Sequence, residues 1–324
     1  MPQHHLTAPR GAELAPKSEF VEGRFGRLFR NLPSFVPGDE ALTALAGAMV
    51  EPDGAGDLDS PIPAGYTYLG QFIDHDITFD PASSLQRLQD PDGLHDFRTP
   101  RLDLDSLYGD GPNNDPYLYD TRIDKGATSF LIGSNGIGEL DLPRNVLPPD
   151  ANNVPQGRAL IGDPRNDENV IVGQLHLLFL RFHNKVVELL REEIGNPEQL
   201  FAEAQRLVRW HYQWIVVNDF VRRICGDGVV DDILRPDTYV TAGGVGEILR
   251  AHLQFYKWKR EPFMPVEFSV AAYRFGHSMI RGGYKLNGDI PAVPLFTEGP
   301  LQNEHQDLRG FRTLATQWTI DWDF

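Results

Sequence analysis

The sequence predicts a mainly α-helical fold with long, irregular connections. Apolar residues recur at helical spacing through residues 167–193, and a second helical pattern covers 197–224. Between them and the N-terminal part, residues 80–160 are dense in Asp, Gly, Pro and Asn, which interrupt regular structure. The chain has 324 residues, of which 41% are hydrophobic and 23% charged. That balance is enough to bury one large core or two modest ones.

The first 65 residues are rich in Pro and Gly and predict an N-terminal arm with one short helix around Asp39–Val50. We place the main domain at residues 66–324. It opens with Tyr66–Phe79, an apolar and aromatic stretch that predicts a buried helix. Residues 80–160 that follow predict loops with a short hairpin.

The strongest helix signal lies at Asp167–Glu193, where Asp163 or Asn166 can serve as the N-cap. Two further helices are predicted over Pro197–Ile224 and Ser269–Met279. The sequence shows no internal repeat and no low-complexity tract.

Composition narrows the range of partners. The net charge of −16 repels phosphate backbones and anionic lipid, so we expect neither nucleic acid nor a membrane surface as a partner. Cys225 is the only cysteine, which rules out an intramolecular disulfide and a cysteine-rich zinc or iron–sulfur site. The N-terminus has no apolar core, so no signal peptide is predicted, and no stretch is long enough for a membrane span. The default expectation is a cytoplasmic protein, with export by another route left open.

The first group of residues with catalytic potential is Gln71, Asp74, His75 and Asp76. Neighbours on a helix point about 100° apart, so Asp74 and Asp76 must face different sides with His75 between them. A histidine with a pKa near neutral can take a proton from a peroxide and return it to the leaving oxygen. Taken alone, the segment favours the structural interpretation, a helix end with two solvated acids and a hydrogen-bonded histidine.

The second group begins the long helix. Arg165 and Glu168 are three residues apart and therefore share a face. The structural alternative is a helix start whose acids complement the dipole and whose arginine pairs with Glu168. Further along, His176 and His183 share a face, and we expect packing and hydrogen bonding for them rather than metal ligation.

The third group is Arg274 and His277, three apart with apolar neighbours. A histidine in apolar surroundings beside an arginine has the layout of a haem axial ligand next to a propionate. Gly276 would let a flat macrocycle approach the backbone. A core histidine with an arginine that reaches to solvent is the competing interpretation.

A fourth group is the acidic loop that contains Thr99, Arg101, Asp103 and Asp105. Oxygen donors at every second or fourth residue can converge from an extended loop, as calcium requires. The calcium interpretation needs Asp76 to lie close to this loop; otherwise the acids are simply solvated.

These segments, in this order, resemble the animal-type haem peroxidases of the peroxidase–cyclooxygenase superfamily. The matching stretches are GQFIDHDITFDP at 70–81, TPRLDLDSLYG at 99–109, GDPRNDENVIVGQLHLLFLRFHN at 162–184 and AAYRFGHSMI at 271–280. The resemblance covers most of the chain from about residue 66 onward. It implies a haem-peroxidase-type helical core with long loops.

The resemblance also implies roles for individual residues. His75 and Arg165 match the distal histidine and arginine above the iron, and Gln71 matches the glutamine that lines the distal water or halide site. His277 matches the proximal iron ligand, and Arg274 matches the arginine that meets a haem propionate. The implied cofactor is haem b.

Further roles concern covalent links and calcium. Asp74 and Glu168 match the carboxylates that form ester links to haem methyl groups in many members. The matching calcium ligands are Asp76, Thr99, the carbonyl of Arg101, Asp103 and Asp105.

The sequence departs from the family pattern in two places. Asn169 stands where some members carry a methionine bonded to haem, so that link is not expected. The family also continues beyond the proximal helix, with an asparagine that hydrogen-bonds the proximal histidine; residues 302–324 contain no such motif, and we expect the C-terminal part of the usual domain to be missing.

The implied function is the reduction of hydrogen peroxide and the oxidation of a small organic or halide donor through a ferryl intermediate. A fatty-acid dioxygenase of the cyclooxygenase type is the nearest alternative. Such enzymes place a tyrosine three residues before the proximal histidine, where this chain has Arg274, and Tyr273 is one position away. A non-catalytic remnant that binds calcium or a partner is the other alternative.

Overall fold

The computed structural model describes residues 25–29, 31–33, 35–50, 52, 60–81, 94–122, 126–135, 140–145, 157–241, 244–257, 262–299, 302–303 and 305–323. Much of the predicted N-terminal arm and parts of the long loop region therefore lie outside the described residues. The described part is mainly α-helical, as predicted. Its central helices are α2 (Gly65–Ile77), α4 (Val170–Leu190) and α5 (Pro197–Ile215).

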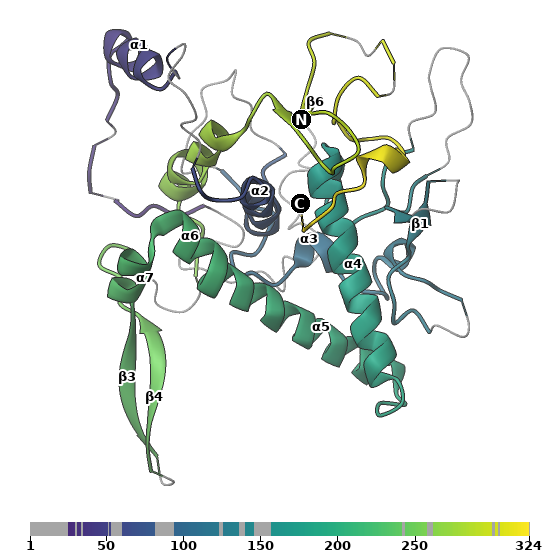
Figure 1. Ribbon diagram of the computed structural model, residues 1–324. Coiled ribbons are helices and arrows are strands. Elements are labelled where there is room, and N and C mark those ends of the chain that lie inside the picture. The colour runs from purple at the N-terminus through teal and green to yellow at the C-terminus, as the bar shows by residue number, and fades with distance from the viewer. Residues whose placement is uncertain are drawn as a thin grey trace, which may run out of the picture.

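The helices α4 and α5 pack against each other at an angle, and α2 packs against α4 (Figure 1). The predicted helix over Tyr66–Phe79 is confirmed as α2, and its last six residues are all buried. Asn169 caps α4, because its side-chain oxygen accepts hydrogen bonds from the backbone amides of Ile171 and Val172. A short 3-10 helix, η3 (Pro164–Asp167), precedes α4 and is capped by Asp163.

The position of the cap corrects one prediction. The long helix begins at Val170, and Asn166 is not its N-cap: the Asn166 side chain instead contacts two histidines, as described below. Asp163, the other predicted cap, caps the preceding 3-10 helix η3, and Asn169 caps α4.

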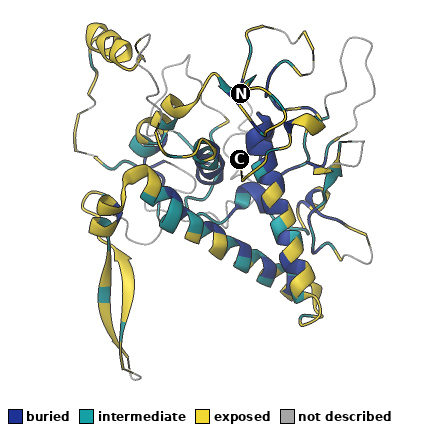
Figure 2. Cartoon of the chain, in the orientation of Figure 1, coloured by how far each residue is buried: buried dark blue, intermediate teal, exposed yellow. Residues whose placement is uncertain are grey.

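The predicted second helix is confirmed as α5, which continues through a π-helical turn, η4 (Val216–Phe220), into α6 (Val221–Cys225). A short helix, α7 (Asp227–Ile233), then leads into an antiparallel hairpin that the sequence analysis did not predict. Its strands are β3 (Leu234–Thr241) and β4 (Gly244–Ala251). The hairpin projects from the helical body and is mostly exposed on both faces, so it lacks the one-sided apolar pattern that marks a packed strand (Figures 1 and 2).

The loop region is irregular, as expected. Where described, it contains a one-turn helix, α3 (Asp105–Tyr108), a 3-10 turn, η2 (Pro116–Leu118), and the predicted short hairpin, formed by β1 (Gly133–Ser134) and β2 (Leu140–Asp141). In the arm, the predicted short helix is confirmed as α1 (Asp39–Ala48), which has no buried residue and stands apart from the body (Figure 1).

The third predicted helix is a different structure. Instead of an α-helix over Ser269–Met279, the chain forms a π-helical turn, η5 (Phe268–Ala272), followed by a 3-10 helix, η6 (Arg274–Met279). Most of this segment's side chains are exposed, and only Phe268 and Tyr273 of its apolar residues pack against the larger core cluster, so little packing stabilises regular α geometry.

Two hydrophobic clusters make up the described core. The larger one joins α2, α4 and α5 around Phe72, which stacks on Phe179 with ring centroids 4.9 Å apart. The smaller one lies at the start of α4, where the C-terminal segment packs with Leu308, Leu314 and Trp318 buried. That segment carries β5 (Gly283–Tyr284), β6 (Val293–Pro294) and a 3-10 turn, η7 (Thr316–Trp318). No described helix has both the length and the apolar composition needed to cross a bilayer.

Candidate active site

His75 is buried near the C-terminal end of α2, with 5% of its surface exposed. Its Nδ1 lies 2.8 Å from Oδ1 of Asn166, and the nearest carboxylate to its Nε2 is Glu168, at 3.9 Å. Burial, followed by the charge of Arg165, lowers the pKa of His75 to about 4. The imidazole is therefore neutral near pH 7 and has a nitrogen that can accept a proton.

Arg165 is anchored to the same part of α2. Its Nη2 donates to the carbonyl oxygens of His75 at 3.0 Å and Thr78 at 2.7 Å, and its guanidinium lies over the ring of Phe79 with 4.6 Å to the centroid. Its carboxylate partner is Asp163, at 2.8 Å, and not Glu168. The cation is thus fixed beside His75 by contacts from two segments that are far apart in sequence.

Asp163 holds two arginines. It is fully buried and pairs with Arg165 and, at 2.6 Å, with Arg98. Burial alone would raise the pKa of Asp163, but hydrogen bonds from Arg165 and the charge of Arg98 hold it well below its usual range. Asp163 therefore carries a permanent negative charge that keeps both guanidiniums in place.

Gln71, Glu168 and Asn169 form a second polar group next to His75. The amide of Gln71 donates to Glu168 and accepts from Asn169 Nδ2 at 3.0 Å. Burial raises the pKa of the Glu168 carboxyl, although nearby Arg165 opposes this. The two segments therefore meet through hydrogen bonds that join Gln71 to both Glu168 and Asn169.

The predicted divergence of Asp74 and Asp76 is observed. Asp74 lies 3.3 Å from Nη1 of Arg274 and accepts a hydrogen bond from the Thr78 hydroxyl at 3.0 Å. Asp76 is fully buried on another side, where it faces the acidic loop. The two acids therefore belong to two different sites.

The segment with His277 touches α2 through its neighbours. Besides the Arg274–Asp74 ion pair, the hydroxyl of Tyr273 donates to the carbonyl of Gly70 at 2.8 Å. His277 itself is exposed, and its Nδ1 donates to the carbonyl of Arg274 at 3.0 Å. That bond fixes the proton on Nδ1 and leaves Nε2 free to bind a metal.

The segment around His277 exposes several large apolar side chains. They are those of Val270, Phe275, Met279 and Ile280, and they lie in the same segment as the exposed Arg274 and Ser278. A largely apolar macrocycle fits such a surface, and the acids and bases that meet on α2 and η3 provide polar groups on the side of His75. The residues present therefore fit haem.

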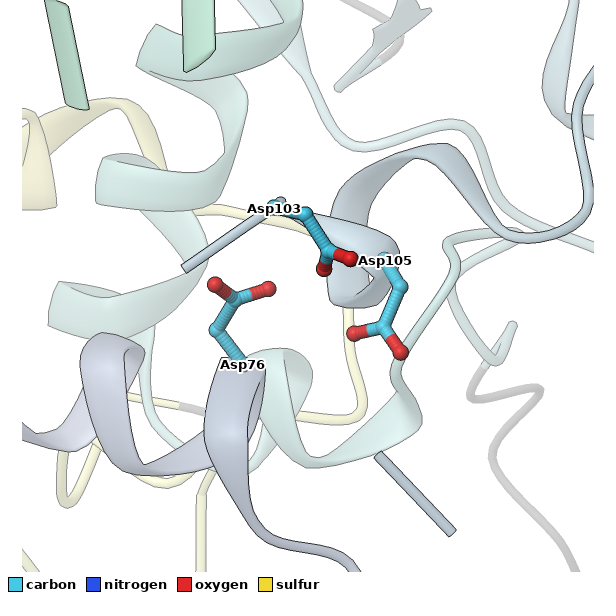
Figure 3. Close-up of side chains that lie close together, drawn as sticks. All are labelled: Asp76, Asp103 and Asp105. Carbon is cyan, nitrogen blue, oxygen red and sulfur yellow. The ribbon is translucent and has the colours of Figure 1, made fainter. Parts of the chain in front are cut away.

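Three aspartates converge between the end of α2 and the start of α3 (Figure 3). One oxygen from each of Asp76, Asp103 and Asp105 lies within 4.8 Å of the others. Oδ1 of Asp103 and Oδ1 of Asp105 are buried and have no hydrogen-bond partner in the described part of the chain. Unpaired buried carboxylate oxygens are costly, so the cluster fits a hard cation.

The charges in this cluster repel one another. Burial, followed by the charge of Asp103, raises the pKa of Asp76 to about 6, and burial raises the pKa of Asp105 well above its usual value. Arg98 lies 3.8 Å from Asp105 and supplies only one positive charge.

The backbone around Asp103 is held in an unusual shape. Leu102 and Leu104 both have positive φ, at 55° and 58°, which is uncommon outside glycine. Helix α5 supports the loop, because Gln213 donates to the carbonyl of Leu102 at 3.0 Å and Arg209 donates to that of Asp103. Such strained loops persist where surrounding contacts hold them.

The remaining predicted calcium ligands lie in the same loop. The hydroxyl of Thr99 donates to Asp103 at 2.7 Å, so in this conformation it supports a carboxylate. Arg101 lies two residues before Asp103.

His176 and His183 are fully buried and bonded, as expected for packed residues. His183 donates from Nε2 to the carbonyl of Thr128 and accepts at Nδ1 from Tyr108. His176 bonds Asn166, and this contact was missed in the sequence analysis, which considered Asn166 only as a cap. In the sequence, a polar residue at the start of a helix looks the same whether it caps the helix or bonds a histidine.

Comparison with known protein families gives one match over most of the chain. The family model described as animal haem peroxidase matches residues 85–304. Similar curated proteins include a "Peroxidase-like protein" of Margaritifera margaritifera, which is 34% identical over 128 residues, 37% of this chain and 14% of that protein. A "Chorion peroxidase" of Aedes aegypti is 27% identical over 42% of this chain and 16% of its own length. The matched region is therefore a small part of these relatives.

Among solved structures, Peroxidase A of Dictyostelium discoideum superposes with a TM-score of 0.55 at 17% identity. The superposition covers 86% of this chain and 61% of that one. At this identity the likeness concerns the fold, and it agrees with the predicted mainly helical class.

Proposed function

Because the chain belongs to the animal haem peroxidase family, we propose that it binds haem between His75 and His277 and uses hydrogen peroxide to oxidise a small organic or halide donor. The observation that carries the proposal is the meeting of buried, neutral His75 with fixed Arg165. The two residues lie 90 positions apart, and Nη2 of Arg165 donates to the backbone carbonyl of His75 at 3.0 Å.

His75 is proposed to move the proton. Its neutral Nε2 accepts a proton from the peroxide oxygen nearer the metal and returns it to the outer oxygen, which leaves as water. Arg165 stabilises the negative charge that develops on the outer oxygen as the O–O bond breaks, an electrostatic effect typically worth about 3 kcal/mol. Bound haem supplies the two electrons for this cleavage and then withdraws electrons from the donor.

Other residues are proposed to hold the group. His277 would hold the iron of this group through Nε2, and its bond to the Arg274 carbonyl orients the ring. Asp74 and Glu168 are the carboxylates proposed to form ester links, and Arg274 is proposed to meet a propionate. Gln71 lies beside Glu168, where it can bind water or a halide.

Calcium is proposed to bind Asp76, Asp103 and Asp105, with Thr99 and the Arg101 carbonyl as further oxygen donors. Two unpaired buried carboxylate oxygens support this. The site lies directly next to His75 in sequence, so a bound ion would help to fix the end of α2.

The test is reconstitution of the full chain with haemin. We expect a Soret band that shifts when one equivalent of hydrogen peroxide is added. The variant His277→Ala should lose the band, and added imidazole should restore it.

A matched control is His211→Ala. His211 is also exposed and also bonds through Nδ1 to a carbonyl one turn earlier, that of Leu207, at 2.7 Å. This variant should keep the Soret band. A band lost equally in both variants, or absent from the unmodified chain, would contradict the proposal.

A fatty-acid dioxygenase remains the alternative to test. Arg274 stands three residues before His277, and its guanidinium pairs with Asp74, whereas the Tyr273 hydroxyl donates to Gly70. Oxygen consumption with a polyunsaturated fatty acid, in the absence of peroxide, would favour the dioxygenase.

A further inference from the structure

Asn166 joins two buried histidines. Its Oδ1 lies 2.8 Å from Nδ1 of His75, and its Nδ2 lies 3.0 Å from Nδ1 of His176. Asn166 and His176 are fully buried, and His75 nearly so. The amide therefore has these two rings as its partners and is shielded from water.

The positions of the amide oxygen and nitrogen assign a tautomer to each ring. An amide oxygen only accepts, so His75 carries its proton on Nδ1 and presents a lone pair at Nε2. An amide nitrogen only donates, so Nδ1 of His176 is unprotonated and its proton sits on Nε2. Burial lowers the pKa of His176 to about 3, which keeps this ring neutral and able to accept.

His176 is the second partner of the amide, and its Nε2 has no hydrogen-bond partner in the described part of the chain, so the orientation of the amide and the tautomer of His176 are set together. If the amide of Asn166 were turned over, its nitrogen would donate to His75, whose proton would then move to Nε2. In that state His75 could not take a proton from a substrate through Nε2. The position of the His176 ring is set by packing: it contacts the Phe72 ring edge-on, with centroids 6.0 Å apart.

We propose that Asn166 and His176 are positioning residues that hold His75 in the tautomer with a free Nε2. Asn166 acts directly on the ring, and His176 acts through Asn166. The inference rests on the proposed function for its catalytic consequence, while the tautomer itself is a property of the chain without haem.

The first test measures the tautomers in the haem-free chain. Histidine labelled with ¹⁵N, observed through two- and three-bond couplings near pH 7, distinguishes protonated from unprotonated ring nitrogens. We expect the proton on Nδ1 in His75 and on Nε2 in His176. The reverse pattern would overturn the proposal, whatever the activity of the protein.

The second test measures reaction with hydrogen peroxide in haem-reconstituted variants by stopped flow. Asn166→Leu removes both hydrogen bonds and should slow the reaction about 10- to 100-fold, the usual cost of losing such a supporting contact. Asn166→Asp keeps an acceptor for His75 and should recover most of the rate. His176→Phe should give a smaller loss, because Asn166 remains but is no longer oriented.

The matched control is Asn184→Leu. Asn184 lies in α4, the helix that follows η3, and also makes two hydrogen bonds, to the backbone of Phe130, at 2.7 and 2.9 Å. It should leave the rate unchanged. A rate for Asn166→Leu equal to that of this control, with the Soret band intact, would contradict the positioning role. Loss of the Soret band from the unmodified chain would contradict the proposed function alone.

Discussion

The two histidines proposed to face each other across the haem sit in very different surroundings. His75 is buried, and its neighbour Arg165 is fixed by two backbone carbonyls and a buried carboxylate. His277 is exposed on a 3-10 helix, and its ring is held by a single backbone carbonyl. His75 therefore lies in a polar network of the chain's own groups, whereas His277 is exposed in a segment with several exposed apolar side chains.

This difference separates two tasks. Peroxide chemistry needs groups fixed in position before the substrate arrives, and buried hydrogen bonds provide this. Ligation of a metal needs a free nitrogen and a fitting surface. We therefore expect substitutions on the His75 side to change rates and stability, and substitutions on the His277 side to change haem binding alone.

The largest expected effect comes from replacing His75. His75→Leu removes the proton acceptor and should slow the reaction with peroxide by about 100- to 10,000-fold while the Soret band remains. Stopped-flow measurement of the haem-reconstituted protein tests this. His183→Leu, also a buried histidine but bonded to Tyr108 and Thr128, is the control and should keep its rate. An equal loss of rate in both variants would mean that His75 has no special role in the reaction.

The next effect concerns stability. Asp163→Ala leaves Arg98 and Arg165 without their buried partner and should lower the free energy of unfolding by about 3 kcal/mol. Urea unfolding of the haem-free chain measures it. Asp227, an exposed partner of Arg222, is the control, and Asp227→Ala should cost less than about 1 kcal/mol. Similar costs would mean that the buried network contributes no more than a surface pair.

Calcium should stabilise the end of α2. At a concentration about 100 times the dissociation constant, it should add about 2.7 kcal/mol to the free energy of unfolding. Thermal unfolding with calcium or with a chelator measures the difference. Asp76→Asn should abolish it. A calcium response that persists in this variant would place the binding site elsewhere.

The same site predicts a pH dependence. Without metal, burial and the charge of Asp103 raise the pKa of Asp76 to about 6. The folded chain therefore binds a proton on the Asp76 carboxyl more tightly than the unfolded chain does. That contribution is fully present below about pH 4 and is lost as pH rises through 6. Calcium should remove the loss, because it replaces the proton. A free energy of unfolding that falls equally between pH 4 and 7 with and without calcium would argue against this.

The smallest effect on stability is expected for the exposed His277. His277→Ala removes an exposed side chain and should change the free energy of unfolding of the haem-free chain by less than about 0.5 kcal/mol. Urea unfolding tests this. A cost comparable to that of Asp163→Ala would show that His277 is part of the folded core and would break the comparison.

Local spacing was enough to predict several features. The helical turn of about 100° per residue required Asp74 and Asp76 to diverge, and they do, toward Arg274 and toward Asp103. The long apolar patterns became α4 and α5 because their apolar faces pack on one another. The motifs also predicted which distant segments would meet.

Other features depend on long-range contacts that no local pattern contains. The periodicity at Ser269–Met279 favoured an α-helix, but the segment has little packed surface and adopts π and 3-10 turns instead. The exposed hairpin β3–β4 carried no one-sided pattern to detect. Asn166 has the side chain of a cap, and only the fold shows that its amide contacts two histidines at once.

By itself, the sequence determined the mainly helical class and the divergence of Asp74 and Asp76 on α2, because both follow from a fixed rise and turn per residue. Only the tertiary structure decided which groups lie in contact: Arg165 with Asp163, Asp76 with the acidic loop, and His75 with Asn166. Such choices depend on which polar groups are buried together, and burial is a property of the whole chain.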